Sequence, residues 1–163
     1  MSVNRGKQFE EVIKKAFEEV EDTIIVRLAD QTNGYVGSKN PCDFLVYRHG
    51  HFYAIECKTI HGNTFPFTNI TDYQYSEISK IASTKGCYGG ILCWWVDKDV
   101  TRFIPIQLIQ AEKQIGAKSI RYDYDFAYYN QETGKISSII NLKGTKKRVF
   151  FDYDIYDFFS NFE

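Results

Sequence analysis

The sequence predicts an α/β fold in which a central β-sheet is flanked by helices, and three observations lead to this prediction. An apolar stripe at helical spacing runs through residues 3–21, two strand-like segments meet at His49-Gly50, and a second capped helix begins at Thr71. The chain has 163 residues, of which 44% are hydrophobic and 25% are charged, as is ordinary for one domain with a core. We therefore expect a single domain over residues 1–163.

The first predicted element is a helix over residues 3–21, whose apolar residues form one stripe that faces the core. Residues 23–28 follow as a strand rich in β-branched side chains. Residues 30–40 form a loop that contains Asn33-Gly34 and Gly37-Ser38. The stripe consists of Phe9, Val12, Ile13, Ala16, Phe17 and Val20.

Residues 43–48 and 51–58 are predicted to be the two strands of a hairpin, because the two-residue connection between them suits a tight turn. Pro41 stands at the entrance to the first strand, where its missing N–H is tolerated. Residues 65–67 form a further extended segment.

The second predicted helix begins at its cap, Thr71, and runs to about residue 85. Residues 87–96 and 101–105 follow as a second hairpin of the same sheet. Residues 107–114 form a short helix, and the periodic signal weakens after it.

The register of the first hairpin places charged side chains together. If the turn is symmetric, Arg48 faces His51, and counting outward sets Asp43 opposite Glu56. Side chains alternate along a strand, so Glu56 and Lys58 point to the same face. Directly opposed side chains lie about 5 Å apart at Cβ, and two like charges there destabilise a sheet unless something offsets them. A divalent cation would offset them.

One face of the hairpin therefore gathers two acids and one amine, a set that suits metal-assisted hydrolysis. Mg²⁺ prefers oxygen ligands and keeps several waters, so Asp43, Glu56 and the main-chain carbonyl of Cys57 form the candidate metal site. Lys58 would activate an attacking water and offset negative charge on a phosphate. The alternative interpretation is structural, with Asp43 as a turn residue, Glu56 as a surface acid and Lys58 as its neutralising neighbour.

Two stretches resemble the PD-(D/E)xK nuclease motif, in which a proline-aspartate precedes a hairpin that ends in Glu-x-Lys. They are Asn40-Pro41-Cys42-Asp43-Phe44 and Ile55-Glu56-Cys57-Lys58-Thr59. Taken with Gly6 to Glu10, Thr64-Phe65-Pro66-Phe67 and Asp72-Tyr73-Gln74, their order is similar to that of the RecU family of Holliday junction resolvases.

The resemblance implies a restriction-endonuclease-like core with a central mixed β-sheet flanked by helices. It also implies metal ligation by Asp43 and Glu56, catalytic assistance from Lys58, and supporting roles for Glu10 and Gln74. The expected cofactor is Mg²⁺, with Mn²⁺ as a substitute, and the expected substrate is branched or four-way junction DNA. Cutting two opposite strands of a junction requires two active sites related by symmetry, so a homodimer is expected.

Helical spacing tests the two supporting residues separately. Gln74 shares a helix face with Ile78 and Ala82, so it is expected to point toward the sheet and to need a polar partner there. Glu10 is aligned with Ile13 at the margin of the apolar stripe. For Glu10, a solvated helix charge is an equally good interpretation.

The chain departs from the family in one region. Cellular RecU-like resolvases carry a long insert, a stalk, before the catalytic aspartate, whereas only residues 30–40 are available here. The chain is then either a compact, phage-type variant or a protein whose selectivity for branched DNA is weaker or is made differently.

Candidate DNA contacts lie in two places. Three of them flank the catalytic hairpin in sequence, and three belong to a basic cluster near the C-terminus, for which a solvated loop is the favoured alternative. The aromatic C-terminal tail is expected to pack in the core or at a dimer contact, with stacking on unpaired bases as the alternative. The six candidates are Lys39, Thr59, His61, Lys146, Lys147 and Arg148.

Composition limits the classes of function. The net charge of -1 and the pI near 6.3 give no global sign of nucleic-acid affinity, so a nuclease would need a local basic surface. No apolar run approaches the length of a bilayer span, so we expect no membrane contact and a cytoplasmic location. The four cysteines lack the spacing of a zinc site and are expected to be reduced thiols.

Three other functions stay open. A PD-(D/E)xK nuclease of another specificity would differ in how it cleaves four-way junctions and linear duplex. A catalytically silent DNA-binding module would bind without cutting. A protein-interaction domain that uses the aromatic tail would show no salt-sensitive DNA binding.

Overall fold

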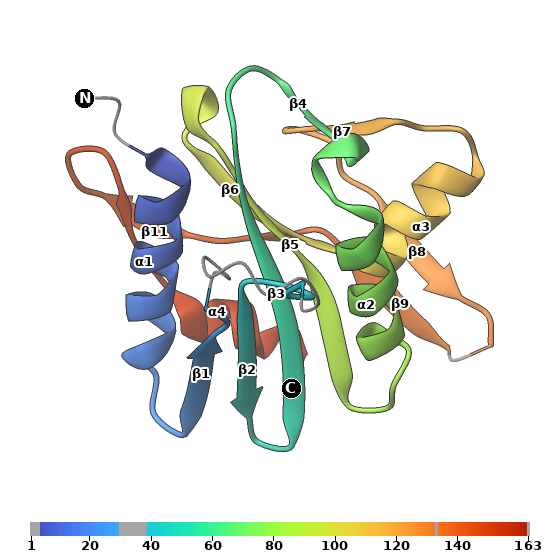
Figure 1. The fold of residues 1–163 in the computed structure, drawn as a ribbon, viewed down its shortest axis with the longest axis horizontal. Coiled ribbons are helices and arrows are strands. Elements are labelled where there is room, and N and C mark those ends of the chain that lie inside the picture. The colour runs from blue at the N-terminus through green and yellow to red at the C-terminus, as the bar shows by residue number, and fades with distance from the viewer. Residues whose placement is uncertain (1–3, 30–38, 133, 163) are drawn as a thin grey trace.

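A six-stranded mixed β-sheet forms the centre of the structure, a computed structural model that describes residues 4–29, 39–132 and 134–162 (Figure 1). In spatial order, its strands are β1 (Thr23–Arg27), β2 (Phe44–Arg48), β3 (His51–Ile60), β5 (Cys87–Trp95), β6 (Val100–Pro105) and β10 (Ile140–Asn141). β3 and β5 are parallel, and the other neighbouring pairs in this sheet are antiparallel. A parallel pair needs a crossover, which α2 (Asp72–Ala82) provides.

Helices cover both faces of this sheet (Figure 1). One face packs against α1 (Arg5–Glu18) and α4 (Ile155–Ser160), and the other packs against α2 and α3 (Ile106–Gln114). The alternation is visible along β3, where Ile55 belongs to the first core and its neighbour Ala54 belongs to the second. The order of one helix, three antiparallel strands, a crossover helix and a parallel strand confirms the predicted α/β fold with a restriction-endonuclease-like core.

Shorter elements surround the sheet. β4 (Thr64–Pro66) pairs with β7 (Ser119–Arg121), β8 (Ala127–Asn130) pairs with β9 (Lys135–Ser138), and β11 (Gly144–Lys146) pairs with β12 (Phe151–Tyr153). Two short 3₁₀ helices are η1 (Phe67–Asn69), before α2, and η2 (Val96–Lys98), between β5 and β6. No helix in the described ranges has the length and apolar character that crossing a membrane requires.

Both helices predicted from periodicity are shorter than expected. α1 ends at Glu18 instead of residue 21, and the chain then turns at Asp22, whose φ of 56° is incompatible with a right-handed helix. α2 ends at Ala82 instead of residue 85, with Ser83 as its C-cap. The apolar faces themselves lie where they are predicted, against the two cores.

The strand boundaries differ by one or two residues from those predicted. β2 begins at Phe44 instead of residue 43, because regular pairing with β3 stops there. β3 continues to Ile60 instead of residue 58, because β5 pairs with it up to that residue. Residue 3 of the predicted first helix and residues 30–38 of the predicted loop lie outside the described residues.

The C-terminal third, where the sequence signal is weak, contributes short strands and the aromatic helix α4. Phe158 and Phe159 of this helix are each 1% exposed. Their rings contact Phe17 of α1 and Tyr53 of β3. The predicted core role of the aromatic tail is therefore confirmed for these two residues.

Candidate active site

Asp43 lies where the ladder between β2 and β3 ends. The predicted hairpin register is confirmed, and its last regular pair is Phe44 with Ile55, so Asp43 and Glu56 are the next positions outward. The Asp43 amide donates to the Ile55 carbonyl at 3.2 Å, and the Cys57 amide donates to Asp43 Oδ2 at 2.8 Å. The second bond holds the aspartate side chain against β3.

Glu56 is a buried carboxylate, 4% exposed, in the middle of β3. Its Oε1 atom accepts from Lys58 Nζ at 2.9 Å and from Gln74 Nε2 at 2.8 Å. Gln74 thus points toward the sheet, as its helical spacing predicts. Glu56 Oε2 is buried and accepts from no donor group among the residues that the structure describes, and the Glu56 side chain lies within hydrogen-bonding reach of the Asp43 carboxyl group. Two donors fix one oxygen of this carboxylate, and the other oxygen is left for a further ligand.

Burial disfavours the charged forms of both carboxyl groups. Burial raises the pKa of Asp43, and the charge of Glu56 raises it further, to about 7. Burial also raises the pKa of Glu56, and the Lys58 ammonium opposes this shift only in part. Keeping both groups ionised near neutral pH therefore requires positive charge in addition to that of Lys58.

The oxygen donors here suit a hard divalent cation. Asp43 and Glu56 supply carboxylates, and the Cys57 carbonyl points to the same edge of β3 as the Cys57 amide, which contacts Asp43. In the described part of the chain, no group of three or more His, Cys, Asp or Glu side chains could hold a metal ion. A cation held by two carboxylates and a carbonyl completes its shell with water or substrate oxygens, as Mg²⁺ commonly does.

Glu10 reaches the hairpin region from α1, on the opposite face of the sheet from α2. Its Oε2 atom accepts from Arg27 Nη2 of β1 at 2.7 Å, and its side chain is 18% exposed. Burial and nearby acids, Glu10 among them, raise the pKa of Cys57. Glu10 is therefore a half-buried acid that is paired with Arg27 and lies close enough to β3 to affect Cys57.

The three predicted DNA contacts next to the hairpin lie in different surroundings. Lys39 is exposed before β2. Thr59 follows Lys58 on β3, so its side chain points to the opposite face. His61 lies beyond the end of β3, where its Nδ1 atom is 3.1 Å from Asp97 Oδ1 in the β5–β6 connection.

The C-terminal basic cluster is matched by acidic side chains. Lys146 forms an ion pair with Asp99, and Lys147 Nζ lies 3.2 Å from Asp152 Oδ2. Arg148 is exposed in the turn between β11 and β12. Two of the three predicted cations in this cluster thus have their charge offset within the chain.

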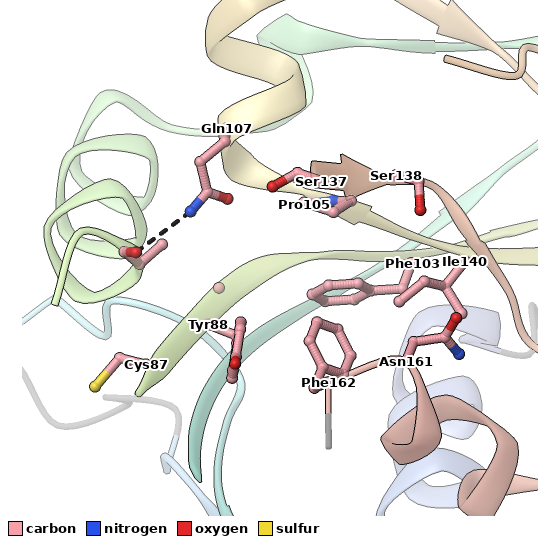
Figure 2. Close-up of a pocket in the computed structure, with 12 residues that line it drawn as sticks. Cys87, Tyr88, Phe103, Pro105, Gln107, Ser137, Ser138, Ile140, Asn161 and Phe162 are labelled. Carbon is pink, nitrogen blue, oxygen red and sulfur yellow. Dashed lines mark hydrogen bonds between the residues drawn. The ribbon is translucent and has the colours of Figure 1, made fainter. Parts of the chain in front are cut away.

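A cavity of about 310 Å³ lies near the start of β5, and Figure 2 shows its lining. The rings of Tyr88, Phe103 and Phe162 form part of its wall, together with polar groups such as Gln107 and Ser137. All the lining residues are uncharged, and none is a predicted site residue. The cavity offers no carboxylate for a metal and no cation for a phosphate, so the carboxylate pair is the candidate active site.

Two residues that support the site were not predicted as parts of it. Arg27 pairs with Glu10 across 17 positions, a separation at which periodicity carries no information. Thr71, predicted only as a helix cap, also holds the side chain of Gln74 through a capping box. The Thr-x-x-Gln spacing, which is typical of a capping box, could have predicted the contact between Thr71 and Gln74.

Comparison with known proteins adds three findings. The family model of RecU, described as Recombination protein U, matches residues 12–143. Among solved structures, the chain is similar to Hjc of Archaeoglobus fulgidus, described as a Holliday junction resolvase from an archaeal hyperthermophile, with 19% identity and a TM-score of 0.42. That match covers 62% of this chain and 74% of the Hjc chain. No curated protein matches the chain significantly.

Proposed function

The chain belongs to the RecU family of Holliday junction resolvases, and on that premise we propose that it is a magnesium-dependent endonuclease that hydrolyses phosphodiester bonds in branched DNA. The buried Oε2 atom of Glu56, which has no hydrogen-bond partner in the described part of the chain, carries this proposal. A buried carboxylate oxygen without a hydrogen-bond donor is costly, and the charge of Glu56 also repels that of Asp43. A cation between these two acids would remove both penalties.

Each residue of the site has a distinct role in the proposed reaction. Asp43, Glu56 and the Cys57 carbonyl would hold the cation, which supplies a water of lowered pKa and offsets charge on the phosphate. Lys58, 22% exposed, contacts Glu56 and reaches the solvent side, where its ammonium can orient the attacking water and stabilise the charge that develops on the phosphate. Gln74 fixes Glu56. Mn²⁺ is expected to substitute, because it accepts the same oxygen ligands.

We further propose that the active form is a homodimer. Resolving a four-way junction requires one cut in each of two opposite strands, and two protomers related by C2 symmetry supply one site for each cut. Water attacks the phosphorus directly, so no covalent enzyme intermediate forms. Glu10 stays a predicted supporting residue, and Lys39, Thr59 and His61 stay predicted DNA contacts.

Cleavage of a synthetic four-way junction tests the proposed function. With Mg²⁺, the wild-type protein is expected to give paired, symmetric nicks, and either chelation of the metal or Glu56→Ala is expected to abolish them. A linear duplex of the same sequence is the comparison substrate. Equal cleavage of junction and duplex would assign the chain another nuclease specificity, and full activity of Glu56→Ala would remove Glu56 from the site.

The matched control is Glu132→Ala. Glu132 is an exposed glutamate in the connection between β8 and β9, and the replacement removes the same charge away from the carboxylate pair. This variant is expected to cleave junctions at the wild-type rate. A loss as large as that of Glu56→Ala would show that the effect comes from net charge and not from the site.

A further inference from the structure

We propose that Thr71 is a positioning residue, which fixes the orientation of the Gln74 amide and thereby holds the Glu56 carboxylate with one oxygen occupied and the other directed to the metal. The inference rests on the proposed function, because it assigns Glu56 a metal to bind. It gives the N-cap of α2 a part in the active site in addition to its part in starting the helix.

The cap of α2 and the carboxylate pair share one side chain, that of Gln74. Thr71 Oγ1 accepts from the Gln74 amide at 3.1 Å, and Gln74 Oε1 accepts from the Thr71 amide at 3.1 Å. These reciprocal bonds make a capping box. The remaining polar group of the side chain, Nε2, donates to Glu56 Oε1 at 2.8 Å.

The capping box determines which end of the Gln74 amide faces Glu56. A glutamine amide carries an acceptor oxygen and a donor nitrogen at nearly equivalent positions, so half a turn exchanges them. The main-chain N–H of Thr71 is a donor and can face only the oxygen. The reversed amide would set an oxygen against the Glu56 carboxylate and a nitrogen against the Thr71 N–H, two unfavourable contacts.

The orientation of Gln74 in turn fixes Glu56. Lys58 alone does not distinguish the two oxygens of the carboxylate, because an ammonium is a compact charge on a flexible stem. Gln74 donates from a fixed position, so Oε1 receives both Gln74 and Lys58, and Oε2 is the oxygen without a partner among the described residues. Because the two oxygens of a carboxylate are equivalent, the cap fixes the position of the group: one oxygen is held by Gln74 and Lys58, and the other is left for a cation.

The other helix caps provide matched controls. Asp154 caps α4 by accepting from the Asp157 amide at 3.3 Å, and its helix packs on the opposite face of the sheet from α2. Replacing a capping side chain destabilises a helix in either place. Among the helices that the structure describes, α2 is the one whose cap is connected to the carboxylate pair.

Turnover kinetics on the full-length protein test this inference. Thr71→Val keeps the main-chain N–H that donates to Gln74 Oε1 but removes the hydroxyl that accepts from the Gln74 main-chain N–H, so it loosens the first turn of α2, which holds both groups in place. It is expected to lower kcat for junction cleavage about five-fold, as partial loss of a cap allows, with little change in KM, and Thr71→Ser is expected to restore it. Asp154→Ala is expected to lower the melting temperature without changing kcat. In a Gln74→Leu background, Thr71→Val is expected to have no further effect on kcat. An undiminished effect in that background would overturn the inference.

A spectroscopic measurement on the metal-free protein keeps this test separate from that of the proposed function. The side-chain amide signals of Gln74 in a ¹⁵N–¹H spectrum are identified by their loss in Gln74→Leu. We expect two well-separated proton signals, which move toward the positions of a solvated glutamine in Thr71→Val but not in Thr71→Ser or Asp154→Ala. Unchanged signals in Thr71→Val would overturn the role of Thr71, even if the protein cleaves junctions as proposed. A protein that shows the shift but cleaves no junction would instead refute the proposed function.

Discussion

Two charged regions of the molecule differ in how their charges are matched. At the hairpin, the half-buried Asp43 and the buried Glu56 lie side by side, and Lys58 is in contact with Glu56. In the C-terminal cluster, Lys146 and Lys147 are exposed, and each pairs with an exposed acid of a neighbouring segment. The first region is short of positive charge, whereas the second is balanced and solvated.

The difference shows that the burial of charged side chains, more than their number, determines where they can take part in catalysis. An exposed ion pair contributes about 0–1 kcal/mol to stability, because water and salt screen it. A buried charge that lacks its partner costs about 3–5 kcal/mol. The net charge of -1 conceals this uneven distribution. The buried deficit of positive charge, not the exposed lysines, is therefore the feature that points to metal-dependent catalysis.

The largest expected effect comes from replacing Asp43, one of the two acids of the carboxylate pair. Asp43→Asn keeps an oxygen that can accept from the Cys57 amide but removes the negative charge that would bind a cation. We expect the rate of junction cleavage to fall about a thousand-fold, since several kcal/mol of charge stabilisation are lost. Single-turnover cleavage at saturating Mg²⁺ measures this fall.

The same substitution is expected to raise the melting temperature of the metal-free protein, because it relieves repulsion between Asp43 and Glu56. A variant that is more stable but less active would show that the charge of Asp43 serves the active site and not the stability of the hairpin. A metal-free variant that is less stable than the wild type would instead show that the Asp43 charge is matched in the apo protein.

The pH dependence of metal-free stability gives the next largest effect. The pKa of Asp43 is raised from 3.8 to about 7 in the folded protein, so the folded state binds more protons than the unfolded state between these values. Its contribution is therefore fully present below about pH 4 and is lost as the pH rises to 7, with a slope of up to about 1.4 kcal/mol per pH unit for one proton. Thermal unfolding in a metal chelator measures this slope.

Asp43→Asn removes the contribution of Asp43 together with its coupling to Glu56, whereas the groups away from this pair are common to the two proteins. The wild type is expected to lose stability relative to the variant as the pH rises from 4 to 7. Adding Mg²⁺ at pH 7 is expected to reverse the trend, because binding favours the ionised carboxylates. Parallel pH profiles for the two proteins would contradict the raised pKa.

The comparison also shows what could be predicted from the sequence. Alternation along two strands and a symmetric turn were enough to bring Asp43, Glu56 and Lys58 to one place, because hairpin register depends on neighbours in the chain. Helical spacing likewise placed Gln74 against the sheet. These predictions use periods of two and 3.6 residues, which a short window of sequence contains.

The remaining contacts join segments that no local period connects. Lys146 and Asp99 are 47 positions apart, so the neutralisation of the basic cluster had no signal in the sequence. The strands beyond Gly116 are two to four residues long, too short for an alternating pattern to stand out. The burial of Glu56 could not be predicted either, because the sequence does not distinguish a solvated glutamate from a buried one. The side chain is buried only because the helices pack on the sheet.

The smallest expected effect belongs to the C-terminal cluster. Lys147→Ala removes a cation that is 62% exposed and paired with Asp152, so the free energy of unfolding is expected to change by less than about 0.5 kcal/mol. Because Asp152 already offsets this charge, the salt dependence of junction binding is expected to stay the same, measured in Ca²⁺ to prevent cleavage. Asp152→Asn is the complementary variant, which frees Lys147 and is expected to tighten binding at low salt. A log–log salt slope that falls by about one in Lys147→Ala would instead identify a phosphate contact, and the basic cluster would then take part in DNA binding despite its acidic partners.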